Sequence, residues 1–177
     1  MTEGSEPLRA SGPQLLIVGQ HPNGRTEYQE IEELHPDWPI TKMVDKWLSK
    51  AGWPEGTAAL TPFVNIIPID VPISNDEIER WSWHVDNRFR QVMPDIVIPL
   101  GRLATNQSLR GGNWRYHFER DAGFMIQGNR LEQSDTGYIV VPFAHPSGRN
   151  RFLTSKQGKE AVRKQIQLLA SLKENIQ

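Results

Sequence analysis

Residues 15–24 read LLIVGQHPNG and residues 138–151 read YIVVPFAHPSGRNR. In each stretch a short apolar run is followed at once by a polar, turn-forming segment, which is typical of a buried strand and the loop after it. In open parallel sheets the loops at the carboxyl ends of the strands converge at one edge, and ligands bind there. Two loops rich in His, Asn, Gln and Arg at such an edge predict an active site.

Strand-like and helix-like segments alternate along the rest of the chain. Short apolar runs predict strands over residues 15–18, 63–67, 95–100 and 138–143. Apolar spacing and capping residues predict helices over 41–53, from 74 or 75 to about 93, from 101 to about 109, and from 155 to about 174. Residues 110–136 are expected to be irregular. Strands separated by helices imply right-handed crossovers, and hence a three-layer α/β sandwich with a central, mainly parallel four-stranded sheet flanked by helices.

Length and composition limit the class of protein. A length of 177 residues fits a single domain, which we expect over residues 14–177. Residues 1–13 are polar, and we expect them to form a flexible segment. The sequence has no cysteine, so it offers no ligands for an iron–sulfur cluster, and its five histidines lack the spacing of metal ligands. No apolar stretch approaches the roughly 20 residues of a membrane span, and residues 1–13 lack a signal-peptide core. We therefore expect a cytoplasmic monomer with no metal, cofactor or membrane contact.

The charge is small in total and uneven along the chain. A net charge of −1 argues against a general polyanion binder. Residues 1–95 contain 8 Lys/Arg and 15 Asp/Glu, whereas residues 96–177 contain 12 and 6. Residues 96–177 therefore carry a net positive charge that could bind phosphates. An ordinary solvated surface is the alternative explanation of the same pattern.

Four motifs, each at a predicted strand end, occur in an order that resembles the uracil-DNA glycosylase superfamily, from about residue 15 to residue 163. They are Gly19-Gln20-His21-Pro22, Asn65 within residues 62–68, the apolar-glycine turn of residues 98–104, and His145-Pro146-Ser147. The resemblance implies a monofunctional DNA glycosylase. Such an enzyme flips uracil or a modified pyrimidine out of DNA and hydrolyses its bond to deoxyribose, in base-excision repair or against hypermodified viral DNA.

The resemblance assigns the catalytic roles to two histidines. His145 would act as a neutral imidazole that donates a hydrogen bond to the departing base and stabilises its negative charge. The alternative is a histidine that packs beside a proline turn. His21 stands where the best-known members have Asp or Asn, which orients or activates water. Histidine can be a general base near neutral pH, so hydrolysis stays possible. The alternatives are that the enzyme excises a different nucleobase, that the water lies elsewhere, or that His21 is a loop residue without a catalytic role.

The base-binding residues follow from the same resemblance. Asn65 would pair with the polar edge of the base, because an amide offers both a donor and an acceptor. The alternative is an asparagine that only terminates a strand. Gln20 would lie beside the base, and an aromatic side chain would stack on it. The candidates for stacking are Tyr28, Trp38 and Phe63.

The segment after His145 is the predicted DNA contact. Ser147 and Gly148 would bind phosphates, and Arg149, Asn150 and Arg151 would enter the minor groove or hold the displaced strand. Many relatives insert an apolar wedge here, and a basic turn that caps the terminal helix is the alternative. Two other functions stay open on the sequence: a non-catalytic module that binds nucleic acid or a modified nucleotide, and a hydrolase of free nucleosides or nucleotides.

Overall fold

The computed structural model describes residues 14–19, 37–55, 57–62, 75–101, 104–105, 126–127, 139–146 and 150–176. The strands are β1 (Leu15–Gly19), β2 (Ala58–Pro62), β3 (Ile96–Pro99), β4 (Ile126–Gln127) and β5 (Ile139–Val140). The helices are α1 (Pro39–Lys50), α2 (Asn75–Val92), α5 (Arg151–Thr154) and α6 (Lys156–Ile176). The segment predicted to be flexible, residues 1–13, lies outside the described residues.

The strands form one sheet in the order β2-β1-β3-β5-β4. The first four are mutually parallel, as predicted, and the short β4 adds an antiparallel edge next to β5. The two residues of β4 fall in the stretch 110–136, for which the sequence predicts irregular structure. The strand that pairs with β1 is Ala58–Pro62. The predicted strand 63–67 lies outside the described residues and begins directly after it.

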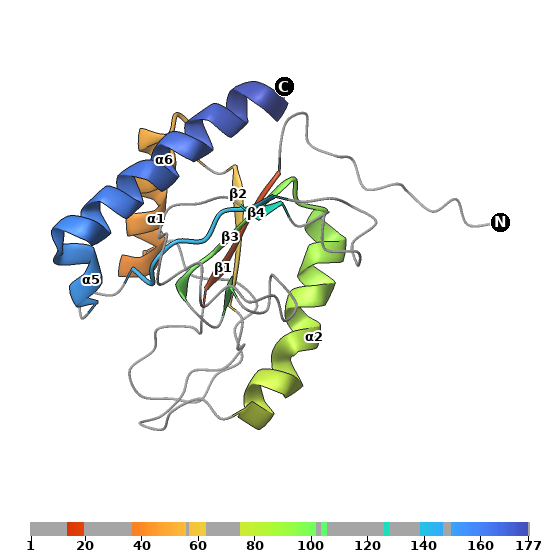
Figure 1. Ribbon diagram of the computed structural model, residues 1–177. Helices are drawn as coiled ribbons and strands as arrows, with labels where there is room; N and C mark the ends of the chain where they lie inside the picture. The colour runs from red at the N-terminus through yellow and green to blue at the C-terminus, as the bar shows by residue number, and fades with distance from the viewer. Residues whose placement is uncertain are drawn as a thin grey trace.

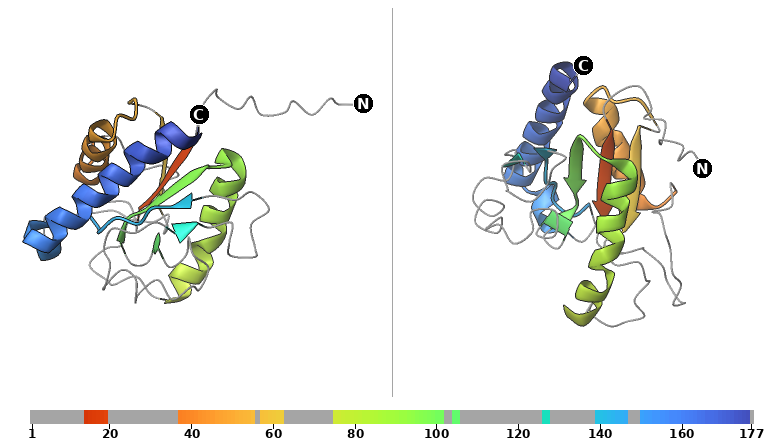
Figure 2. Two further views of the ribbon diagram at one scale, coloured as in Figure 1. Left: turned by 45° about the horizontal axis from the view of Figure 1, so that its top comes forward. Right: turned by 90° about the vertical axis from the view of Figure 1, so that its right-hand side faces the viewer.

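The helices cover both faces of the sheet. Helices α1 and α6 lie on one face and α2 lies on the other, as Figure 1 and Figure 2 show from three directions. This arrangement confirms the three-layer α/β fold. Among the described residues, no helix is both long and apolar enough to cross a membrane.

The core follows from the alternation of side chains along the strands. Leu15 and Ile17 of β1, with Ile96 and Ile98 of β3, belong to the cluster that packs against α1 and α6. The residues between them point to the opposite face by the two-residue period of a strand. Those residues are also fully buried, as expected where helices cover both faces of a parallel sheet.

Two tryptophans belong to this core. Trp47 and Trp53 are buried in the α1–α6 layer. The indole N–H of Trp53 donates to the carbonyl of Leu169 in α6, over 3.1 Å. The ring of Trp47 stacks on Phe143, with 4.8 Å between the ring centroids and 17° between the planes. Helix α1 is therefore fixed both to α6 and to the chain just after β5.

Candidate functional site

The parallel strands end together at one edge of the sheet. The register pairs Gly19 with Pro62, Val18 with Pro99, and Leu100 with Phe143. The chain segments that follow these strands therefore leave from the same edge. Strands β1 and β5 are separated only by β3, so the chain departs from Gly19 and from Phe143 at points about 10 Å apart, two strand spacings.

His145 lies at this edge, two residues beyond Phe143. Its side chain is half-buried, and both of its chain neighbours, Ala144 and Pro146, are buried. The chain leading to it is held on several sides. The N–H of Phe143 donates to Pro99 over 3.0 Å, and the carbonyl of Phe143 accepts from Gly101 over 2.8 Å. His145 therefore extends from a short segment that is hydrogen-bonded to β3.

Helix α6 fixes the same segment from the other side. Gln165 is almost completely buried, and its Nε2 donates to the carbonyl of Pro142 over 2.6 Å. The stacking of Trp47 on Phe143 adds a contact from α1. Since rigid supporting contacts are what make a catalytic side chain precise, residues 142–145 are well suited to hold one.

Gly101 forms a surface against which the His145 side chain packs. The glycine has φ of +82°, and a methyl group added to its α-carbon would lie 3.0 Å from Cβ and 3.4 Å from Cδ2 of His145. Any residue with a side chain would thus carry backbone strain and press on the imidazole. The hydroxyl of Thr105 donates to the carbonyl of Gly101 over 2.8 Å and helps to fix this turn.

Asn150 is hydrogen-bonded both to His145 and to Phe152. Its Nδ2 donates to the carbonyl of His145 over 2.9 Å. Its Oδ1 accepts from the N–H of Phe152 over 3.1 Å, which makes Asn150 the N-cap of α5. One side chain therefore joins the start of α5 to the backbone of His145, and Arg151 follows it as an exposed residue in the first turn of α5.

The structure describes only part of the predicted site. His145, Asn150 and Arg151 lie together at the carboxyl edge, while Trp38 is the N-cap of α1. The other predicted residues lie outside the described residues: Gln20, His21, Tyr28, Phe63, Asn65, Ser147, Gly148 and Arg149. By chain order Gln20 directly follows β1, and Phe63 directly follows β2. Among the described residues, no group of three His, Asp or Glu side chains has the arrangement of a metal site.

Two features of the site are not predicted by the sequence. The contact between Gly101 and the ring of His145 joins residues 44 positions apart, and only the strand register brings them together. The second is the hydrogen bond from Asn150 to the carbonyl of His145. The sequence assigns Asn150 to DNA, with a turn that caps the terminal helix as the alternative, and in the structure Asn150 caps α5. Its position directly before a helical turn is a usable signal, because asparagine is a preferred N-cap residue.

The fold and the site together define an α/β protein with a histidine at the carboxyl ends of parallel strands, where such folds bind their ligands. The family model described as the Uracil DNA glycosylase superfamily matches residues 8–170, and the chain belongs to this family. No curated protein gives a significant match. Family membership supports DNA glycosylase activity, with DNA as the substrate.

Proposed function

We propose that this protein is a monofunctional DNA glycosylase that hydrolyses the N-glycosidic bond of uracil or a modified pyrimidine flipped out of DNA. The observation that carries the proposal is the support of His145. Its side chain packs on Gly101, its carbonyl is held by Asn150, and the chain before it is bonded to β3 and α6. Together with the family match, this support favours a catalytic side chain over a histidine that merely packs beside a turn.

The proposed chemistry is mainly electrostatic. As the bond from the sugar C1′ to the base nitrogen breaks, the sugar acquires oxocarbenium character and the base leaves as an anion. His145 donates a hydrogen bond to the base oxygen on which the negative charge collects. Water then adds to C1′ and loses a proton, and the base is protonated, so that the products are the free base and an abasic deoxyribose.

His21, Gln20 and Asn65 complete the proposed site. Gln20 and His21 follow Gly19, where β1 ends, and Asn65 is three positions beyond Pro62, where β2 ends. Since both strands end at the edge that carries His145, the chain order supports placing these side chains around one base. His21 positions or activates the water, and Asn65 pairs with the base. Gln20 lies beside the base, and Phe63 or Tyr28 stacks on it.

The proposed DNA contact is the segment 147–151. It connects His145 to α5, and the exposed Arg151 stands at its end. Backbone amides and hydroxyls there are suited to phosphates, and arginines to phosphates or the minor groove.

An excision assay tests the proposal. Labelled single- and double-stranded oligonucleotides carrying uracil, mismatched thymine, hydroxymethylated or glucosylated pyrimidines are incubated with the protein, and abasic sites are cleaved with alkali. We expect cleavage of at least one substrate and a loss of about 10²–10³ in rate for His145→Ala, the cost of removing one such donor. Gln167→Ala, an exposed change in α6, is the control and retains full activity.

Two outcomes would overturn the proposal in different ways. Salt-sensitive DNA binding with no cleavage of any substrate indicates a binding module that lacks the chemistry. Hydrolysis of free nucleosides or nucleotides without cleavage of oligonucleotides indicates a hydrolase of small substrates. If His145→Ala cleaves the substrate at the native rate, the protein is a glycosylase but His145 does not have the proposed catalytic role.

A further inference from the structure

The exposed side of α6 has a different charge in its two halves. In the first half the exposed residues include Lys156, Lys159, Glu160, Arg163 and Lys164. Their spacing of three, four and seven positions places them on one side of the helix. In the second half none of the exposed residues is basic: they are Gln167, Ser171, Glu174 and Asn175.

The basic half is the half beside the site. Gln165 donates to the carbonyl of Pro142, two residues after β5, and the first turn of α6 follows α5, whose N-cap Asn150 is bonded to His145. The far half is tied to the end of α1 through the bonds of Leu169 to Trp53 and of Lys173 to Gly52. The C-terminal end of α6 lies on the side of the sheet where β1 begins, in Figure 1 and in both views of Figure 2. Positive charge is therefore concentrated near the carboxyl edge.

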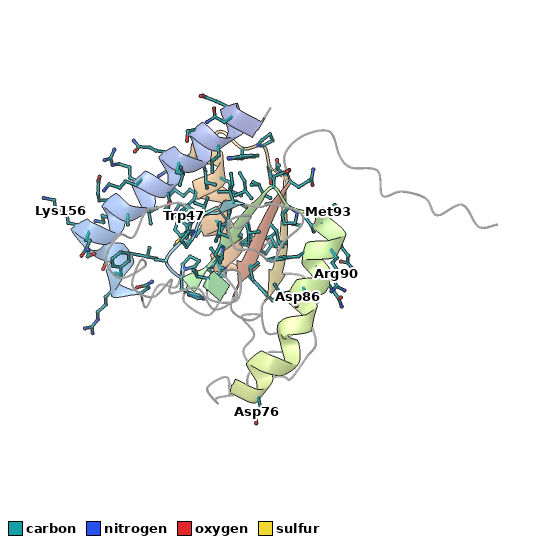
Figure 3. All side chains as sticks on the ribbon, turned by 45° about the vertical axis from the view of Figure 1, so that its right-hand side comes forward. Trp47, Asp76, Asp86, Arg90, Met93 and Lys156 are labelled. Atoms are coloured by element: carbon teal, nitrogen blue, oxygen red, sulfur yellow. The ribbon has the colours of Figure 1, made fainter. Side chains whose placement is uncertain are left out.

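The cations stand on a surface that faces away from the protein. The opposite side of the helix is the buried one, formed by Gly158, Ala161, Gln165 and Leu169. Figure 3 shows Lys156 projecting outward at the α5 end of α6. Arg151, an exposed residue in the first turn of α5, adds a positive charge next to Asn150, which is bonded to the carbonyl of His145.

One acid interrupts this surface and is partly neutralised. Glu160 accepts a hydrogen bond from Nε of Arg163 over 2.9 Å. That hydrogen bond, with the charges of Arg163, Lys164 and Lys156, holds the pKa of the Glu160 carboxyl below its usual value. The carboxylate thus stays ionised at neutral pH and pairs with Arg163, whereas Lys156, Lys159 and Lys164 supply the remaining positive charge.

We infer that Arg151, Lys156, Lys159 and Lys164 form a phosphate-binding surface, the α6 basic surface, for the DNA backbone that flanks the flipped nucleotide. The inference rests on the proposed function, since it assumes a nucleotide held at the His145 edge. Binding by lysines to phosphates is independent of sequence and releases counterions, so it depends steeply on salt. The surface supplies binding and takes no part in bond cleavage.

The test compares two triple variants with the same change in charge. Lys156→Gln/Lys159→Gln/Lys164→Gln removes the surface. Lys46→Gln/Lys50→Gln/Arg90→Gln removes three exposed cations from later turns of α1 and α2. Fluorescence anisotropy with an undamaged labelled duplex at several salt concentrations gives the slope of log K against log salt. We expect the first variant to lower the slope by about 0.9 for each phosphate that it no longer neutralises, and the control to keep the wild-type slope.

A substitution in the opposite direction sharpens the result. Glu160→Gln removes the one acid of the surface and releases Arg163 from its carboxylate partner. We expect tighter binding and a steeper salt slope. On a cleavable substrate, we expect the variant Lys156→Gln/Lys159→Gln/Lys164→Gln to raise KM and to leave kcat unchanged.

Equal slopes for the two triple variants would overturn the α6 basic surface, whether or not the protein cleaves DNA. A lower slope in the first variant alone supports it. Because the duplex is undamaged, this readout needs no excision. A protein that shows the expected slopes but cleaves no substrate would thus retain the surface and lose the proposed function.

Discussion

The two edges of the parallel sheet use their contacts differently. At the amino edge, side chains join one element to another: the N–H of Gln14 donates to Asp95 over 2.8 Å, and the indole of Trp53 donates to Leu169. At the carboxyl edge, the contacts converge on a single residue. Gly101 packs on the side chain of His145, and Asn150 holds its carbonyl.

Under the proposed function, the two edges of the sheet divide stability from catalysis. Contacts that join elements at the amino edge oppose unfolding and touch no residue of the candidate site. Contacts at the carboxyl edge fix the position of an imidazole, so their removal should be visible in catalysis beyond any fall in stability. Substitutions at the two edges can therefore be matched and compared.

The largest effect on stability is expected at Trp53. Replacement by Phe removes the buried hydrogen bond to Leu169 and leaves unfilled volume between α1 and α6. We expect a decrease of about 2 kcal/mol in the free energy of unfolding. Thermal unfolding followed by circular dichroism should show the midpoint lowered by about 4–8 °C. The excision rate per folded molecule, measured well below that midpoint, should be unchanged; a fall in it would show that the two edges are coupled.

Gly101→Ala should affect both stability and catalysis. The left-handed backbone costs about 1–2 kcal/mol for a residue with a side chain, and the new methyl group presses on His145. We expect kcat to fall about tenfold, because a displaced donor loses about 1.4 kcal/mol of transition-state stabilisation.

Gly52→Ala is the matched control for this backbone strain. Gly52 has a similar φ of +78° but lies after α1, where an added methyl group meets only Lys173 Nζ at 3.8 Å. It should lose similar stability and no activity. If the two alanine variants show the same kcat, the contact of Gly101 with His145 has no catalytic role.

The sequence predicted the fold well because buried parallel strands are continuous apolar runs. Residues 15–18 and 96–99 are of this kind, and both strands lie inside the sheet. The position of strand β2 is harder to predict, because it is an edge strand whose residues Ala58–Leu60 are only half-buried. The run 63–67 directly after it is more apolar, and the sequence therefore predicts the strand there. Strand β4 is two residues long and has no periodicity to detect.

Residue types and chain order were enough to nominate candidate site residues, but not their contacts with one another. The sequence could single out His145 because it comes shortly after an apolar run and stands in a motif, and its catalytic role stays a prediction. Its packing on Gly101 could not be found, because it depends on which strands are neighbours and on their register. The cap of α5 by Asn150 has a local sequence signal, whereas its hydrogen bond to His145 depends on where the chain brings residues 145 and 150 together, which residue types do not specify.

The smallest expected effect is also the most specific, because Asn150 has two separable functions. As N-cap of α5 it accepts a hydrogen bond from Phe152, and as a loop clamp it donates to His145. Asn150→Ala removes both and should cost about 1 kcal/mol in stability. Asn150→Asp keeps the acceptor for the cap, but its carboxylate cannot donate to the His145 carbonyl.

We expect Asn150→Asp to lose less stability than Asn150→Ala, because it keeps the cap of α5, and to share the lowered kcat of Asn150→Ala. Thermal unfolding and single-turnover excision, measured on the same three proteins, give the two readouts independently. Recovery of both stability and kcat in Asn150→Asp would assign Asn150 to capping alone. Weaker DNA binding by both variants, with kcat unchanged, would assign it to a direct interaction with DNA. A lowered kcat in Asn150→Asp, with DNA binding unchanged and the cap of α5 kept, identifies the hydrogen bond to His145 as the one that positions the imidazole.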